Sequence, residues 1–557
     1  MINNQIFFIL IYFLIPFSTL GFGFLATSFF FNKKNIDIGF IGLTGIFVLI
    51  FYSYLSHFFY SHNQFHNLLL LLVGLYFFII YFNKISFFEI KILISFQVIL
   101  FISILIYKPH DDFSYYHFPY TYYLNEFSQI IGIGNFNHGF RTHSSIFYLN
   151  SLFYLPGIKY FLYHIGALLI MMFANTHLIL NIIKKLKSKK IDEFFYLNLI
   201  SFVFINIFFY RLAEHGTDRS AQILIFLLLI MLLNFRFSYL SFETYITKIF
   251  ILTGIIVSLK SFYFVYFIFL IPMVFYILKD EKLSLIKNIF KNKVFYIFTL
   301  LISLNLLIYF LNTGCLLYPI SQTCFANVDW GVPIENVKRM NLHYEWWSKG
   351  GGGPGYFSPI DPTDYVKINN WFPNWIDRYF FSKVSDFLGG IAIICIIIFL
   401  LFKSKYKKKY SQINYKLFYL TLFVLFLEWF FYHPSLRYGG YVIISLIIFI
   451  PLSIFMSRFN LAKNKLIKYS SILIILTISI FLIRNIDRIF YEVRFYNFDL
   501  INSFNYKIED DYFRIDNLFK KQFEEYEKCK NENRDCIFIE NYDLKKLFRK
   551  FTFIKDN

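Results

Sequence analysis

Hydrophobic runs long enough to form membrane helices recur from residue 5 to residue 486, and short polar stretches separate them. A helix needs about 20 mostly apolar residues to cross a bilayer, so each run is interpreted as a crossing. The pattern predicts an all-α polytopic membrane protein, a helical bundle of about 14 transmembrane helices. The expected spans are residues 5–31, 36–58, 65–82, 87–107, 160–183, 194–211, 219–237, 246–259, 261–278, 294–311, 384–402, 416–432, 441–457 and 469–486.

The composition agrees with this class, since 57% of the 557 residues are hydrophobic and only 16% are charged. A water-soluble fold of this composition would lack the polar side chains to cover its surface. A secretory signal followed by a soluble enzyme is excluded as well, because apolar runs continue far beyond the first one.

The formal net charge of +19 would suggest a nucleic-acid partner in a soluble protein, but here the basic residues cluster in loops between spans. Basic loops of membrane proteins face the cytoplasm, so membrane lipids and no nucleic acid are the expected partners. We place four loops inside, namely Lys184–Lys190, Lys279–Lys293, Lys403–Lys416 and Arg458–Lys468. The segments expected outside are 108–159, 212–218, 312–383, 433–440 and a small soluble tail, 487–557; an even number of spans puts both termini outside.

The cysteines support this topology. Cys315 and Cys324 lie close together in one outer segment, and Cys529 and Cys536 lie close together in the tail, whereas Cys395 stands alone inside a span. Paired cysteines on the oxidising side suggest two local disulfides, with unpaired thiols as the alternative. A zinc site is disfavoured, because neither pair has the short spacing of such sites.

Two adjacent acids, Asp111 and Asp112, follow the span 87–107 directly, and His117 comes shortly after them. Carboxylates at a membrane surface are costly to desolvate and need water, a cation or a positively charged substrate group beside them. A functional role explains the position of these carboxylates better than packing does. The first outer loop, 108–159, is therefore a candidate site for chemistry at the membrane surface.

A second acidic turn lies between two later spans and contains Glu214, His215 and Asp218. Together with Asp111 or Asp112, its carboxylates could hold a divalent cation such as Mg²⁺ or Mn²⁺, because hard cations prefer carboxylate oxygens from separate segments. The alternative is a solvated turn in which the arginines on either side neutralise the acids.

Two cations occupy other outer turns. Arg437 has the planar side chain best suited to grip a phosphate in two places, although a plain headgroup anchor is equally consistent with its position. Lys260 interrupts two hydrophobic runs and is either a phosphate ligand or a side chain that snorkels to the interface. The long loop 312–383, with its glycine run and tryptophans, is either a lid over a lipid-linked substrate or a structural cap.

The order of these features resembles the GT-C class of polytopic glycosyltransferases. In that class an acidic pair follows the first helix of a seven-helix module, a second acidic turn lies between helices three and four, and a long external loop follows helix seven. Counting from span 87–107, this chain has Asp111-Asp112, then Glu214 to Asp218, then the loop 312–383 at those places. The turn ending in Lys260 also looks like a Gly-Leu-Ala-x-x-x-Lys turn of the class, with Ser261 where the class has glycine.

A narrower likeness lies within the first outer loop. The segment from Asp112 to Pro119, followed by Gly134 to Phe147 with Arg141 and His143, is similar to an uncharacterised group of bacterial membrane proteins. The resemblance covers about 87–311 well and 312–440 loosely, and residues 1–82 and the tail fall outside it. We expect five parts of the chain. These are extra N-terminal helices (1–82), a seven-helix module (83–311), a long outer loop (312–383), C-terminal helices (384–486) and the tail (487–557).

The resemblance implies a membrane glycosyltransferase that moves a sugar from a polyprenyl-phosphate-linked donor to a glycan, lipid or protein acceptor, with inversion, at the outer face of the bacterial cytoplasmic membrane. Asp111, or less favourably Asp112, would be the base, so Asp111→Asn is expected to abolish transfer. Lys260, Arg437 and Arg141 would hold the phosphate. The remaining candidates, which would line the acceptor side or hold an optional metal, are His117, His143, Glu214, His215 and Asp218.

Two other classes stay open. A polymerase or ligase of the O-antigen type would share the substrate and an outer loop with arginine and histidine. A lipid-linked oligosaccharide flippase would have about as many helices, but its charges should lie in mid-span. Only Lys260 and Glu428 are strong candidates for buried charge, which favours the transferase.

Overall fold

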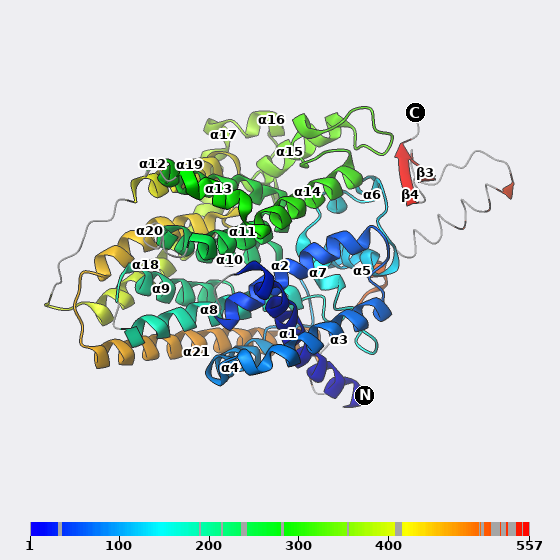
Figure 1. The fold of residues 1–557 in the computed structure, drawn as a ribbon. Coiled ribbons are helices and arrows are strands. Elements are labelled where there is room, and N and C mark those ends of the chain that lie inside the picture. The colour runs from blue at the N-terminus through cyan, green and yellow to red at the C-terminus, as the bar shows by residue number, and fades with distance from the viewer. Residues whose placement is uncertain are drawn as a thin grey trace.

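The computed structural model of the chain is a bundle of long helices with short helices and loops packed against it (Figure 1). It describes residues 2–31, 36–188, 191–212, 216–235, 242–279, 283–353, 356–406, 415–500, 502 and 506–513, and in the tail residues 524, 528, 531–532, 542–547 and 550–555. The described residues are almost all helical, as the hydrophobic pattern predicts.

A helix lies at each of the fourteen hydrophobic runs. These helices are α1 (Ile2–Phe30), α2 (Ile38–His57), α3 (Gln64–Tyr81), α4 (Phe87–Phe101), α8 (Ile165–Ser188), α9 (Glu193–Phe208), α10 (Gly216–Phe235), α11 (Phe242–Leu259), η5 with α12 (Ser261–Phe269 and Leu270–Lys279), α14 (Lys293–Thr313), α18 (Ser385–Phe402), α19 (Lys416–Tyr432), α20 (Gly440–Met456) and α21 (Lys463–Tyr496). Within the described residues, ten helices are long and apolar enough to cross a membrane. The chain is thus a multi-pass membrane protein with ten candidate spans, and the count of fourteen stays a prediction.

The four helices outside the ten are short. α4 has 15 residues, α9 has 16, and α19 and α20 have 17 each. The expected span 87–107 is shortened because helix α4 ends at Phe101, and the chain then turns toward Pro109. An apolar run therefore overstates the length of the helix that it contains.

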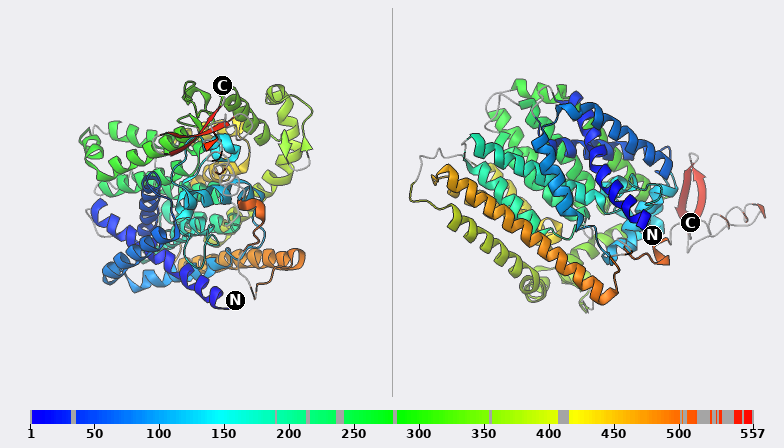
Figure 2. Two further views of the ribbon diagram at one scale, coloured as in Figure 1. Left: turned by 90° about the vertical axis from the view of Figure 1, so that its right-hand side faces the viewer. Right: turned by 90° about the horizontal axis from the view of Figure 1, so that it is seen from below.

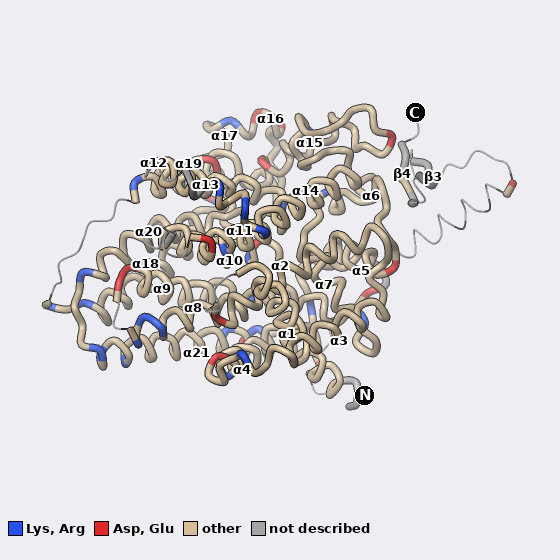
Figure 3. Tube along the Cα trace, in the orientation of Figure 1, with Lys and Arg blue, Asp and Glu red and all other residues tan. Residues whose placement is uncertain are grey.

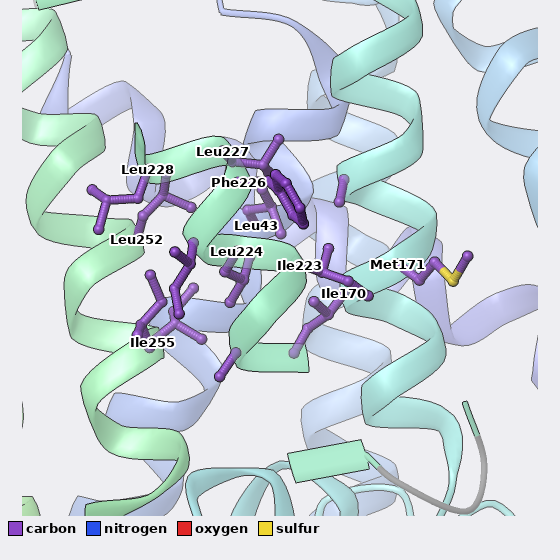
Figure 4. Close-up of a cluster of buried hydrophobic side chains, with 14 of the residues drawn as sticks. Leu43, Ile170, Met171, Ile223, Leu224, Phe226, Leu227, Leu228, Leu252 and Ile255 are labelled. Carbon is purple, nitrogen blue, oxygen red and sulfur yellow. The ribbon is translucent and has the colours of Figure 1, made fainter. Parts of the chain in front are cut away.

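The core of the bundle lies where α2, α8, α10 and α11 meet. Figure 4 shows Leu43 of α2, Ile170 of α8, Ile223 of α10 and Leu252 of α11 directed into one cluster, and each of them is buried. α2 also packs against α7 (Ser145–Ser151) and α14. The helices before residue 82 are therefore part of the same core rather than a separate layer.

A glycine permits the close approach of α2 and α8. A Cβ atom added at Gly42 would lie 2.1 Å from a ring carbon of Phe173, which is far inside van der Waals contact. The backbone of α2 can therefore lie against the Phe173 ring only without a side chain at this position.

Figure 2 shows α21 (orange) along the flank of the bundle, where it packs against α9 and α18.

Basic residues gather toward one end of the bundle, on the left in Figure 3. Lys187 lies in the last turn of α8, Lys403 follows α18 and Lys463 begins α21. A hydrogen bond of 2.9 Å from Tyr415 to Glu193 joins the starts of α19 and α9 at the same end. This grouping agrees with the alternation expected for cytoplasmic loops.

The segments between the spans are mostly folded. They contain η1 (Phe82–Lys84), η2 (Phe113–His117), α5 (Phe118–Glu126), α6 (Ile133–Phe136), η3 (His138–Arg141), α7, α13 (Leu283–Lys291), η6 (Ser321–Thr323), α15 (Ile334–Ser348), β1 (Gly352–Gly353), β2 (Tyr356–Phe357), α16 (Pro362–Tyr365), α17 (Ile368–Trp375), η7 (Ile376–Val384) and η8 (Leu436–Tyr438). β1 and β2 form a short antiparallel hairpin. The long loop 312–383 is thus a helical cap.

One of the two predicted disulfides is confirmed. Cys315 and Cys324 are bonded to each other at the start of the cap. Cys395 is a free, half-buried thiol in α18, as expected for a lone cysteine in a span. Cys529 and Cys536 lie outside the described residues.

The tail packs back onto the first outer loop. The backbone N–H of Lys507 donates to the carbonyl of Tyr107, and the buried ring of Tyr512 packs against Phe118. The tail also contains η9 (Asp510–Phe513) and an antiparallel hairpin of β3 (Tyr542–Leu547) and β4 (Lys550–Lys555). Figure 1 shows this hairpin beside α6, so the tail and the first loop share one end of the molecule.

Candidate functional site

A cavity of about 610 Å³ lies at the end of the bundle opposite the lysine-rich end, where the helices meet the cap. Its walls come from four parts of the chain that are far apart in sequence. Residues of these parts that line it are Asp112, Tyr115, Tyr116 and His138 of the first outer loop, Lys260 and Phe262 after α11, His343, Tyr344 and Trp347 of α15, and Glu428, His433, Arg437 and Tyr438 around the α19–α20 turn.

Local backbone structure aims three of these side chains into the cavity. Asp112 opens the π-helical turn η2, and Lys260 stands in extended conformation between α11 and η5. Arg437 lies in η8, just before Gly439, whose φ of +93° favours glycine. A Cβ atom at Gly439 would also lie 2.3 Å from the hydroxyl of Tyr266, so this turn needs glycine for two reasons.

Two cations and two carboxylates form one network beside the cavity. Lys260 Nζ lies 2.9 Å from Asp218 Oδ1, and Arg437 Nε lies 3.7 Å from Asp218 Oδ2. Arg437 Nη1 lies 3.9 Å from Asp112 Oδ2. The Asp218 side chain is 12% exposed and that of Asp112 is 33% exposed, so Asp218 anchors the cations from behind while Asp112 stands at the open edge.

Aromatic rings surround the two cations. Lys260 Nζ lies 4.9 Å from the ring centre of Tyr438, and the Arg437 guanidinium lies 5.2 Å from that of Trp347. Such contacts hold a cation in place without neutralising it. The rings leave the charge of each cation in place, and the nearby carboxylates of Asp112 and Asp218 balance it.

The cap forms the roof and is fastened to the turn that carries Arg437. Trp375 Nε1 donates to the carbonyl of Pro434 over 2.9 Å, and Tyr379 hydrogen-bonds to Ser435 over 3.1 Å. Movement of the cap would therefore move Arg437 as well.

Three further ionisable groups on the wall, His138, Glu428 and His433, were not among the residues predicted for the site. His433 Nδ1 lies 3.5 Å from Glu428 Oε1. His138 Nδ1 lies 2.7 Å from the hydroxyl of Tyr115. The only sequence signal for Glu428 was a lone acid near the end of an apolar run, which points to a buried charge but to no particular partner.

Asp111 lines a different cavity from Asp112. Successive residues on a helical turn point about 100° apart, and Asp111 faces a polar cavity of about 390 Å³ against α21. That cavity is also lined by Lys108, Arg484 and Arg488. The sequence favoured Asp111 as the base, but the structure places Asp112 rather than Asp111 beside Lys260 and Arg437.

Three other predicted residues do not line the main cavity. Arg141 Nε donates to the carbonyl of Gly134 over 2.7 Å and supports the first loop. His143 is fully buried, its Nε2 lies 2.8 Å from Asn305 Oδ1, and burial lowers its pKa to about 3. His117 packs against Phe147, and burial, followed by the charge of Lys260, lowers its pKa well below the usual value.

Among the residues that the structure describes, the predicted metal ligands do not gather at one site. Glu214 and His215 lie outside the described residues, and Asp111 lines the other cavity. Within the described part of the chain, no group of three or more His, Cys, Asp and Glu side chains gathers to hold a metal ion. Asp218 is paired with Lys260 and Arg437, and Asp112 with Arg437, so a dication beside these carboxylates would meet like charge.

Comparison with known proteins gives one match. No curated protein and no solved structure matches the chain. A family model matches residues 6–444, which reach from α1 into α20 and include every residue that lines the main cavity. The chain therefore belongs to the family described as a domain of unknown function (DUF8201).

Proposed function

We propose that this protein is a membrane glycosyltransferase of GT-C type that takes a sugar from a polyprenyl-phosphate-linked donor. One observation carries the proposal: Asp112, Lys260 and Arg437 converge from three distant segments on a single cavity at a helix-end face. Two cations suit a phosphate, and a carboxylate nearby suits the deprotonation of a hydroxyl. These are the two needs of glycosyl transfer from a phosphate leaving group.

In this reaction the acceptor hydroxyl gives its proton to the carboxylate of Asp112. The acceptor oxygen attacks the anomeric carbon while the bond from that carbon to the phosphate oxygen breaks, so the configuration inverts. The polyprenyl phosphate leaves with the bonding electrons, and Lys260 and Arg437 stabilise its added negative charge. Asp218 acts as a positioning residue, because it holds both cations on one side.

The aromatic wall and roof suit the sugar. Tyr115, Tyr344 and Trp347 present flat faces to the cavity, against which a sugar ring can lie. The acceptor would be a glycan, lipid or protein at the outer face of a bacterial cytoplasmic membrane, with the lysine-rich end of the bundle inside.

The position of the charges disfavours a flippase. Lys260 directly follows α11, Asp218 lies in the first turn of α10, and Arg437 precedes α20, so all three stand at helix ends rather than in mid-span.

A polymerase or ligase of the O-antigen type is the second candidate. The observation that favours it is the presence of His433 and Arg437 on the same wall.

Binding of the lipid phosphate, which is the leaving group of the proposed reaction, tests the proposal. The purified full-length protein is titrated with a polyprenyl phosphate, and the complex is measured by native mass spectrometry for the wild type, Lys260→Gln and Arg437→Gln. Hydrogen bonds to charged groups contribute roughly 1.5–3 kcal/mol each, so each variant should bind on the order of 10- to 100-fold more weakly.

Arg458→Gln, at the opposite end of the bundle, is the control and should bind like the wild type. Equal binding by all four proteins would contradict the proposal.

A further inference from the structure

A second large cavity, of about 870 Å³, lies at the lysine-rich end of the bundle, far from the proposed active site. Six helix ends meet around it: the ends of α1, α3 and α8, and the starts of α2, α4 and α11. In the predicted topology all six ends face the cytoplasm. The cavity is therefore at the level of the inner headgroups.

The lining combines cations with apolar side chains. Lys84, Lys184, Lys187 and Lys248 supply four ammonium groups. The apolar part of the wall consists of Phe24, Ile38, Ile41, Phe88, Leu180 and Ile183. A wall of this kind is complementary to a molecule that has an anionic head and hydrocarbon chains.

The two carboxylates of the cavity are already engaged by the protein. Both oxygens of Asp37 lie 2.9 Å from His177 Nδ1, and Asp37 also accepts the backbone N–H of Phe40. Glu89 Oε2 accepts the backbone N–H of Ile38 over 3.0 Å. These acids therefore cap α2 and hold α8, and Asp37 also interacts electrostatically with Lys248.

The lysines lack such partners. In the part of the chain that the structure describes, no carboxylate lies within 4.0 Å of the ammonium groups of Lys84, Lys184, Lys187 or Lys248. Lys187 and Lys248 instead lie over the rings of Phe88 and Phe40, at 5.0 and 4.7 Å. Four ammonium groups against two carboxylates give the cavity lining a net positive charge, which favours an anion.

From this charge balance we infer that the cavity binds an anionic phospholipid of the cytoplasmic leaflet, with the phosphate among the lysines and the acyl chains along the apolar wall. The bound lipid would join α2, α8 and α11 at their cytoplasmic ends. This site is independent of the chemistry at the opposite face.

The test uses native mass spectrometry of the full-length protein in detergent, titrated with phosphatidylglycerol or with phosphatidylcholine of the same chains. The wild type should bind phosphatidylglycerol more tightly. Each basic side chain near an anionic lipid contributes about 1 kcal/mol, so the triple variant Lys84→Gln/Lys184→Gln/Lys187→Gln should lose on the order of 100-fold in affinity for phosphatidylglycerol.

The matched control is Lys403→Gln/Lys463→Gln/Lys465→Gln, which removes three lysines from the same end of the bundle but outside the cavity. It should retain the preference of the wild type. Equal losses in the two triple variants would overturn the inference, as would equal affinity of the wild type for both lipids. Displacement of phosphatidylglycerol by millimolar inorganic phosphate would identify a free-anion site instead and would also overturn it. Gel filtration and thermal unfolding check that each variant is folded.

Discussion

Replacing Asp112 with asparagine should stop sugar transfer without unfolding the protein. The same change at Asp111 should leave both sugar transfer and folding intact. Asn keeps the shape of the side chain but cannot accept a proton from an acceptor hydroxyl. Removal of a positioned general base costs typically 10²–10⁴-fold in rate, or roughly 3–5 kcal/mol in the activation barrier. Asp111 is the matched control because it is the neighbouring residue but lines another cavity.

The structure also limits the cost of Asp112→Asn to stability. The Asp112 carboxylate is one-third exposed, and its ion-pair partners, His110 and Arg437, are 3.6 and 3.9 Å away. Ion pairs of this kind contribute less than about 1 kcal/mol to folding. The expected change in the free energy of unfolding is therefore several times smaller than the change in the activation barrier, and the two effects can be separated.

The assay incubates each purified protein with a polyprenyl-phosphate-linked sugar and a host membrane extract as the source of acceptor. Released polyprenyl phosphate is measured by mass spectrometry, and thermal unfolding is measured on the same samples. If Asp111→Asn loses activity and Asp112→Asn keeps it, the assignment of the base is wrong. If both variants keep activity within about threefold, no carboxylate of this loop is the base.

Further predictions concern the roof, a buried histidine and the disulfide. Trp347→Ala should raise the KM for the sugar donor by about tenfold through loss of an aromatic face, with kcat little changed; an unaltered KM would place the sugar elsewhere. Burial lowers the pKa of His143 in the folded protein to about 3. As the pH falls below about 6.5, His143 is therefore protonated first in the unfolded state, and the free energy of unfolding decreases from there down to pH 3. At pH 5 the loss is about 2 kcal/mol, and His143→Gln should unfold with a weaker pH dependence than the wild type, a difference that thermal melts at pH 5 and 7.5 would reveal. Cys315→Ser should lower the melting temperature of the cap without changing membrane insertion, and limited proteolysis should then cut the cap faster; unchanged proteolysis would mean that the disulfide does not hold it.

The sequence predicted the helical membrane fold, and it grouped two residues that the structure brings together. Hydropathy located a helix at all fourteen runs, because backbone hydrogen bonding within a bilayer leaves few alternatives to a helix. The positions of Lys260 and Arg437 were predicted to share a function, and the structure brings both to Asp218.

Other features depended on side-chain direction, which linear patterns do not encode. Asp111 and Asp112 are equivalent in the sequence, yet one helical step sends them into different cavities. His143 looked like a candidate ligand in an outer loop, but tertiary packing buries it against Asn305. Trp347 was one of several aromatic residues in an aromatic-rich chain, so only the docking of α15 distinguishes it as part of the cavity.

The most direct test of the proposed function is a cryo-EM map of the full-length protein with the lipids that co-purify with it. The proposal predicts density for a polyprenyl phosphate in the main cavity, with the phosphate between Lys260 and Arg437 and within reach of Asp112. A cavity that opens to alternate sides of the membrane, with no lipid at these residues, would contradict the transferase and favour a flippase.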